Sequence, residues 1–115
     1  MLYHVTTREE WMRAQAGGVY HPSSLDTEGF IHASFASQVF DVANARFRGQ
    51  TNLVLLCIDS SGVSASIRED VVLLPGGQNA RFPHIYGPLN IAAVVRVFDL
   101  PPVVDGTFAL PAEAV

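Results

Sequence analysis

The sequence contains no lysine, and all seven of its cationic side chains are arginine. Eleven acidic residues outweigh them, and at a formal net charge of −4 the chain lacks the basic surface of a general nucleic-acid binder. The absence of lysine also excludes Schiff-base and P-loop lysine chemistry. Arginine suits bidentate capture of a carboxylate or phosphate, so a small anionic ligand stays among the candidates.

Cysteine and long apolar runs are equally scarce. Cys57 is the only cysteine, which excludes an internal disulfide and is typical of a reducing compartment. The longest apolar run, Leu53 to Ile58, has six residues, whereas a membrane-spanning helix needs about 20. The N-terminus lacks the basic start and apolar stretch of a signal peptide. We therefore expect a cytoplasmic protein without a membrane partner.

Hydrophobic residues make up 49% of the 115 residues, which predicts one domain over residues 1–115. We expect its core at about residues 2–100 and a C-terminal extension, with one edge strand, at residues 101–115. The apolar stretch from Val103 to Val115 either tucks inward or contacts another copy, so the oligomeric state stays open.

Periodicity and turn residues predict an α+β fold without βαβ alternation. Thr7 and Glu10 match a capping box, so a helix should run from Arg8 to about Ala16. A second helix is expected from about Ser37 to Phe47, with Arg46 on its apolar face, either snorkelling or pointed into a cleft. Strands are expected at residues 2–6, 30–34, 52–59 (the central one), 64–74 and 91–100.

Two of the predicted strands carry a histidine on the same face as a hydroxyl. His4 shares its face with Thr6, and His32 shares its face with Ser34. If these strands pair, two imidazoles and two hydroxyls meet on one surface. That surface is the first candidate binding site, although each histidine taken alone is more often a structural residue.

A zinc site is the rival explanation of the histidines. Its ligands would come from His4, His32, His84 and an acid such as Glu28 or Glu69. The chain contains neither HExxH nor CxxC, so we expect no metal.

The segment from Arg81 to Leu89 is stiffened by two prolines and contains Phe82, His84 and Tyr86 at alternate positions. If these three side chains share one side, the segment is suited to act as a lid over a flat ring. A proline-locked crossing between sheet strands explains the same residues, and the sequence does not separate the two interpretations.

Three separated segments resemble a small bacterial family called domain of unknown function 952. They appear in the family's order and cover Leu2 to about Phe98: Leu2–Thr7, Glu28–Ser34 with Gln38-Val39 after it, and Phe82–Leu89. That family is grouped by fold with ADP-ribosyltransferase-like proteins, including RNA 2′-phosphotransferases. The resemblance implies a split, mostly antiparallel β-sandwich with two helices that binds NAD in a cleft between two sheets.

The resemblance also implies site residues. His4 and His32 are expected to contact ribose or phosphate, and Glu69 to act as the catalytic acid, although Asp70 fits that position as well. The further residues expected to bind the nucleotide are Thr6, Ser34, Arg46, Arg68, His84 and Tyr86. ADP-ribose transfer is the activity implied. A catalytically silent module that binds a small metabolite or a partner is the alternative, and metal-dependent hydrolysis is a third.

Overall fold

Strand β4 (Leu53–Ile58) lies at the centre of the computed structural model, which describes residues 1–74, 76–103 and 105–108. All six of its residues are buried. Its even-numbered side chains pack in a first hydrophobic core and its odd-numbered side chains in a second. Because successive side chains of a strand point to opposite faces, an uninterrupted apolar run fits a strand covered on both sides. The predicted central strand is confirmed.

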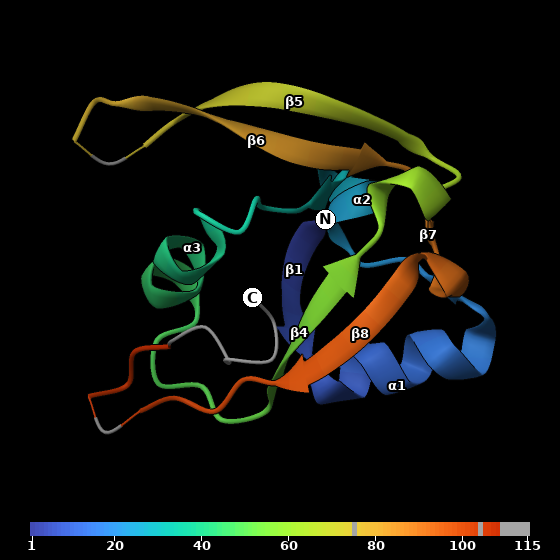
Figure 1. Cartoon of the computed structure of the whole chain (residues 1–115), viewed down its shortest axis with the longest axis horizontal. Helices are drawn as coiled ribbons and strands as arrows, with labels where there is room; N and C mark the ends of the chain where they lie inside the picture. Colours follow the sequence, from blue (N-terminus) through green and yellow to red (C-terminus); the bar gives the residue numbers. More distant parts are fainter. Residues whose placement is uncertain (75, 104, 109–115) are drawn as a thin grey trace.

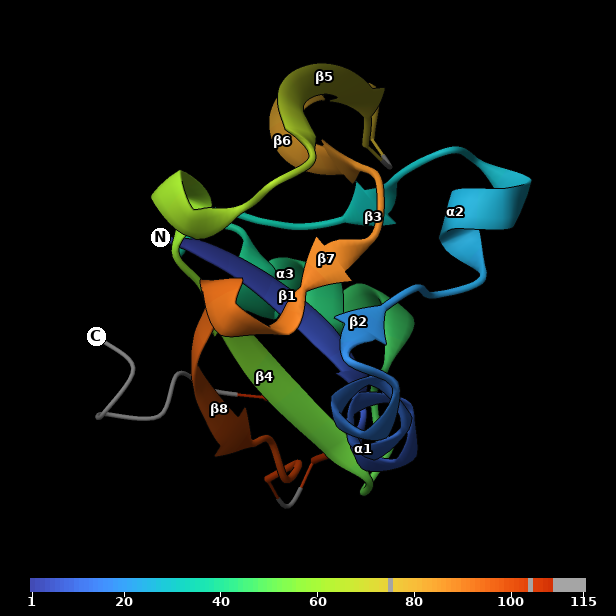
Figure 2. The same ribbon diagram turned by 90° about the vertical axis from the view of Figure 1, so that its right-hand side faces the viewer.

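Antiparallel pairing builds three sheets around this strand (Figure 1). The central sheet has the order β1 (Leu2–Thr7), β4, β8 (Val94–Asp99), and the second has the order β3 (Ile31–His32), β6 (Asn79–Tyr86), β5 (Ser66–Leu73). The short strands β2 (Val19–Tyr20) and β7 (Leu89–Asn90) form a third. The β5–β6 hairpin lies above the central sheet in Figure 2, and the first core fills the space between these sheets. The α+β prediction with antiparallel sheets is confirmed.

Helices cover the central sheet on both faces. Helix α1 (Arg8–Gly17) buries Trp11 in the first core, and α3 (Val39–Arg46) buries Val39 in the second. Both predicted helices are present, and Thr7 caps α1 by accepting a hydrogen bond from the Glu10 backbone N–H at 3.1 Å. A third α-helix, α2 (Ser24–Thr27), was not predicted. Two 3₁₀ turns complete the described helices: η1 (Ser60–Gly62) and η2 (Ile91–Ala93).

The proline-rich segment is neither a lid nor a crossing, because residues 82–86 belong to β6, the central strand of its sheet. Proline is rare in central strands because it cannot donate to the ladder. Here the Pro83 carbonyl accepts from the Ala33 N–H at 3.2 Å, so this residue faces the β3 side. Strand β3 has ended by Ala33, and the missing proline donor therefore costs no ladder bond.

Several predicted strands are shorter than expected. The strand expected at 30–34 is limited to β3, and the late strand begins at Val94, after η2. Among the described residues of the extension there is no strand, and Phe108 packs in the second core. Residues 75, 104 and 109–115, which include most of the predicted apolar tail, lie outside the described structure. No helix in the described part of the chain is long and apolar enough to cross a membrane.

Because β4 is buried on both sides, shortening one of its side chains should destabilise the protein far more than shortening an exposed side chain on the edge strand β8. Leu56→Ala should lower the free energy of unfolding by about 2–5 kcal/mol, because Leu56 is completely buried in the first core. Val95→Ala on the edge strand should change it by less than about 0.5 kcal/mol, since Val95 is 50% exposed. Urea unfolding of both variants measures the difference, and similar losses would contradict the central position of β4.

Candidate functional site

Polar and aromatic side chains gather on the face of the second sheet that points away from the first core. Ile31 on β3 and Ile85 on β6 point into that core, so the residues next to each of them along its strand point the other way. Pairing then sets His32 opposite His84, and His84 opposite Arg68 on β5. We call this surface the histidine face, and it consists of Glu28, Phe30, His32, Arg68, Asp70, His84 and Tyr86.

The histidine face contains two imidazole–carboxylate pairs. His84 Nδ1 lies 2.7 Å from Asp70 Oδ2, and His32 Nε2 lies 2.7 Å from Glu28 Oε2. The two imidazole rings are nearly perpendicular, with centroids 5.4 Å apart. Two titratable rings are therefore held side by side, each oriented by its own carboxylate.

Asp70 is the shared hydrogen-bond acceptor of the first pair. The Tyr86 hydroxyl and His84 both hydrogen-bond to Asp70 Oδ2, and these bonds lower the pKa of the Asp70 carboxyl. Because an ionised carboxylate only accepts hydrogen bonds, His84 Nδ1 donates, and in the neutral ring Nε2 keeps its lone pair. The same carboxylate raises the pKa of Tyr86, which therefore stays a neutral donor.

The second nitrogen of His84 reaches solvent although the residue is almost completely enclosed. The His84 side chain is only 5% exposed, and its Nε2 has no hydrogen-bond partner among the described residues. Within that same part of the chain, no buried side-chain nitrogen or oxygen lacks a partner. His84 Nε2 must therefore be the accessible edge of an otherwise buried ring.

Phe30 covers this site. Its ring stacks on His84 with centroids 4.1 Å apart and planes 11° apart, and it also contacts His32 and Tyr86. Gly29 precedes it with a φ of +88°, a left-handed conformation that turns the chain between α2 and β3. The aromatic side chain thus excludes water from one face of the His84 ring.

Two arginines act on the carboxylates of the histidine face, Arg68 from within the face and Arg46 from the end of α3. The Arg68 guanidinium carbon lies 4.9 Å from the centre of the Tyr86 ring. Arg46 ends α3 and lies close enough to Glu28 to help lower the pKa of that carboxyl, although the hydrogen bond from His32 is the larger cause. Among the described residues, no carboxylate forms a salt bridge with either arginine. Both guanidinium groups are therefore open to an anionic ligand.

His4 lies apart from this face. Its Nδ1 donates to the His32 backbone carbonyl, and its Nε2 lies 2.7 Å from the Tyr20 hydroxyl, which in turn lies 3.1 Å from Thr6 Oγ1. A carbonyl only accepts, so neutral His4 must accept at Nε2 from Tyr20, and Tyr20 must accept from Thr6. Desolvation by burial lowers the pKa of His4 to about 4 and raises the pKa of Tyr20 to about 12.

The structure brings only part of the expected site together. His32, Arg68, His84 and Tyr86 lie on the histidine face, and Arg46 acts electrostatically on the Glu28 carboxyl of that face. The four remaining residues lie elsewhere: His4, Thr6, Ser34 and Glu69.

The expected meeting of His4 and His32 on one outer surface is wrong. Strands β1 and β3 belong to different sheets, and His4 reaches the backbone of His32 but not its ring. Ser34 is buried, and its backbone N–H and C=O bridge to Tyr3 at 2.8 Å each. Glu69 and Asp70 are neighbours on β5, so their side chains point to opposite faces, and only Asp70 reaches His84.

Sequence reasoning missed two residues of the site. Phe30 and Glu28 received no binding role there beyond a metal ligand for Glu28. Phe30 precedes His32 by two residues, immediately before β3, and such alternation is the pattern of side chains that share one face, whereas Glu28 is brought to His32 by the turn at Gly29. The signal for Phe30 was therefore present in the sequence, and the signal for Glu28 was not.

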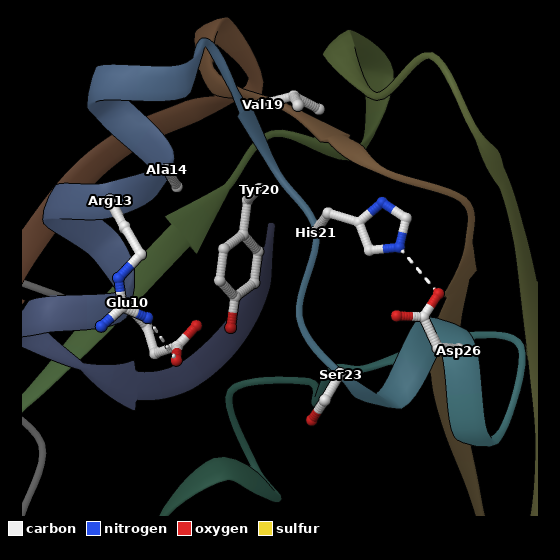
Figure 3. Close-up of a pocket in the computed structure, with 8 residues that line it drawn as sticks. All are labelled: Glu10, Arg13, Ala14, Val19, Tyr20, His21, Ser23 and Asp26. Carbon is white, nitrogen blue, oxygen red and sulfur yellow. Dashed lines mark hydrogen bonds and ion pairs between the residues drawn. The ribbon is translucent and has the colours of Figure 1, made fainter.

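A separate pocket of about 400 Å³ lies between α1 and α2 (Figure 3). Its charged groups pair with each other: Arg13 with Glu10 at 3.1 Å, and His21 with Asp26 at 3.2 Å. The hydroxyl of Tyr20 belongs to the His4 hydrogen-bond chain. None of the residues expected from the sequence to form the site lines this pocket, so we do not assign the site to it.

Metal ligation has no preformed set of ligands in the described structure. Nowhere in residues 1–74, 76–103 and 105–108 do three or more His, Cys, Asp or Glu side chains converge in a way that could hold a metal ion. The two histidines of the histidine face each pair with a carboxylate of their own.

Comparisons with known proteins show one family and one closely similar fold. The model of the family described as "Protein of unknown function (DUF952)" matches residues 5–97. The crystal structure of protein CC0527 from Caulobacter crescentus is 35% identical with a TM-score of 0.84, covering 98% of this chain and 96% of that one. The solution NMR structure of CC0527 is 38% identical with a TM-score of 0.77, covering 92% and 89%. The search of curated proteins gave no match.

The low pKa of His4 predicts a loss of stability in mild acid. The unfolded chain takes up a proton at His4 near pH 6.5, whereas the folded protein does so only near pH 4. The contribution of His4 is therefore complete above pH 6.5 and declines as the pH falls towards 4, by at most about 3 kcal/mol.

Urea unfolding at several pH values tests this. His4→Gln should be less stable at pH 7 by about 1–3 kcal/mol, because Tyr20 and the His32 carbonyl lose a partner. It should also lose less further stability between pH 6.5 and 4 than the wild type does. His21→Gln, at a half-exposed histidine, is the control and should keep the wild-type slope.

Proposed function

Because this chain belongs to the DUF952 family, whose description assigns no function, we propose from the geometry that it binds a nucleotide-class ligand on the histidine face, with NAD as the first candidate. The observation that carries the proposal is the adjacency of stacked aromatic rings, two oriented imidazoles and the Arg68 guanidinium, which has no carboxylate partner among the described residues.

The aromatic rings favour a ligand that contains a flat ring. Phe30 and Tyr86 are both half-buried, with centroids 5.3 Å apart, so each keeps some ring surface accessible. A nucleobase or nicotinamide ring can stack on such a surface and gain about 1–3 kcal/mol. Arg68 already lies over the Tyr86 ring, and a guanidinium plane stacks equally well on a base.

The charges favour a phosphate on the same ligand. Arg68 extends from β5 and Arg46 from the end of α3, and each acts electrostatically on one carboxylate of the histidine face, Arg68 on Asp70 and Arg46 on Glu28. Arginine forks bind phosphate oxygens in pairs, and neutral imidazoles donate to or accept from ribose hydroxyls. The net charge of −4 opposes a nucleic-acid polymer, so a mononucleotide or dinucleotide is the better fit.

NAD and ADP-ribose transfer are supported by the sequence resemblance to ADP-ribosyltransferase-like proteins. One observation argues against glycosyl transfer at this face. Asp70, the acid on the histidine face of β5, is occupied by bonds from Tyr86 and His84, and Glu28 is paired with His32. A transferase of that kind needs a carboxylate near the developing charge on ribose, and both carboxylates of this face already have imidazole partners.

Thermal unfolding against NAD, ADP-ribose, NADP and a 2′-phosphorylated nucleotide tests the proposal. A ligand at 100 times its dissociation constant should add about 2.7 kcal/mol, which raises Tm by several degrees. Arg68→Ala should reduce the shift substantially, because it removes a phosphate contact and the stacked guanidinium. Arg48→Ala is the matched control, since Arg48 bonds a distant loop at the Asp105 carbonyl. No shift with any nucleotide would contradict the proposal.

A further inference from the structure

Resting on the proposed nucleotide site, we propose that His84 is a general base and His32 a general acid for phosphodiester transfer within a ribonucleotide. The two imidazoles lie side by side, each is oriented by a carboxylate, and each keeps one nitrogen without a protein partner among the described residues. One imidazole that accepts a proton and a second that supplies one are what a displacement at phosphorus requires.

His84 has the geometry of a base. Asp70 accepts from Nδ1, so the lone pair of the neutral ring lies on Nε2, the edge that reaches solvent. The Phe30 stack does not block this nitrogen, because a lone pair lies in the ring plane and stacking covers only the ring face. Asp70 also stabilises the imidazolium that forms, and Tyr86 holds the carboxylate in place.

His32 has the geometry of an acid. Its Nε2 is bonded to Glu28, and the side chain is 33% exposed, so Nδ1 is the nitrogen available to a ligand. The hydrogen bond from His32 lowers the pKa of Glu28, which therefore stays an ionised acceptor that orients the ring. His32 is thus suited to give a proton to a leaving oxygen.

The step balances without any co-reactant. The ribose 2′-hydroxyl loses its proton to His84 Nε2 as its oxygen forms a bond to the neighbouring phosphorus. The bond from phosphorus to the 5′-oxygen breaks, and that oxygen takes the proton from His32 Nδ1. The products are a 2′,3′-cyclic phosphate and a free 5′-alcohol. Arg68, which lies over the Tyr86 ring of the same face, is the guanidinium that can bind the phosphate oxygens, where charge accumulates in the transition state.

Incubation with adenylyl-3′,5′-adenosine tests the proposal, with product separation by reverse-phase chromatography. We expect release of adenosine and adenosine 2′,3′-cyclic phosphate, and no cleavage of the 2′-deoxy counterpart, which lacks the nucleophile. His84→Gln and His32→Gln should each be slower by about 100-fold or more. His21→Gln, outside the face, should cleave at the wild-type rate.

The pH dependence separates a chemical role from a structural one. The rate should be bell-shaped, since His84 must be neutral and His32 protonated. Asp70→Asn removes the carboxylate that accepts from His84 Nδ1 and orients the ring, so kcat should fall while KM changes little. Asp70 is a positioning residue in this scheme, and a variant that raises KM with kcat unchanged would overturn that role.

The possible results distinguish a failure of the nucleotide-binding proposal from a failure of the acid–base proposal. If the 2′-deoxy probe raises Tm but the ribose probe is not cleaved, the acid–base pair is overturned and nucleotide binding stands. If no nucleotide raises Tm, both proposals fail. Equal cleavage by wild type and His84→Gln identifies a contaminant and also overturns the pair. Should His84→Gln not fold, nitrogen-15 NMR of the wild type decides: at neutral pH His84 must be protonated at Nδ1, and the opposite tautomer excludes it as the base.

Discussion

The hydrogen bond from His4 to the His32 carbonyl joins the central sheet to the second sheet, and the position of the whole candidate site depends on it. The backbone bridge between Tyr3 and Ser34 reinforces the same junction. Burial keeps His4 neutral, which makes Nδ1 a donor and Nε2 an acceptor. Protonation of His4 would remove the Nε2 lone pair that accepts from the Tyr20 hydroxyl, so only the neutral ring makes both hydrogen bonds.

Neighbouring carboxylates then decide what the imidazoles of the second sheet can do. His84 is buried but reaches a charged acceptor, which offsets the cost of enclosing a polar ring. His32 is more open and hydrogen-bonds to the half-exposed carboxylate of Glu28. The same residue type therefore occupies three environments in one small domain: a neutral structural ring at His4, an enclosed ring at His84 and a partly exposed ring at His32.

Local signals were sufficient for the elements that depend on few distant contacts. The cap at Thr7 and the left-handed Gly18 delimit α1, and the apolar run of β4 matches a strand covered on both faces. Strand β6 was not predicted because Pro83 argues against a central strand. Pro83 is tolerated because β3 is only two residues long and has ended opposite it, so no backbone donor is needed at that position. The length of β3 cannot be read from the sequence of β6.

The sequence by itself determined the presence of α1, α3 and β4, the α+β class and the alternation that puts Phe82, His84 and Tyr86 on one face. It could not decide between Glu69 and Asp70. Adjacent strand residues point to opposite faces, and only the pairing of β5 with β6 determines which one meets His84. Tertiary structure likewise separated His4 from His32, because their strands joined different sheets. Periodicity relates the residues within a strand, whereas register and sheet membership depend on contacts between segments far apart in the chain.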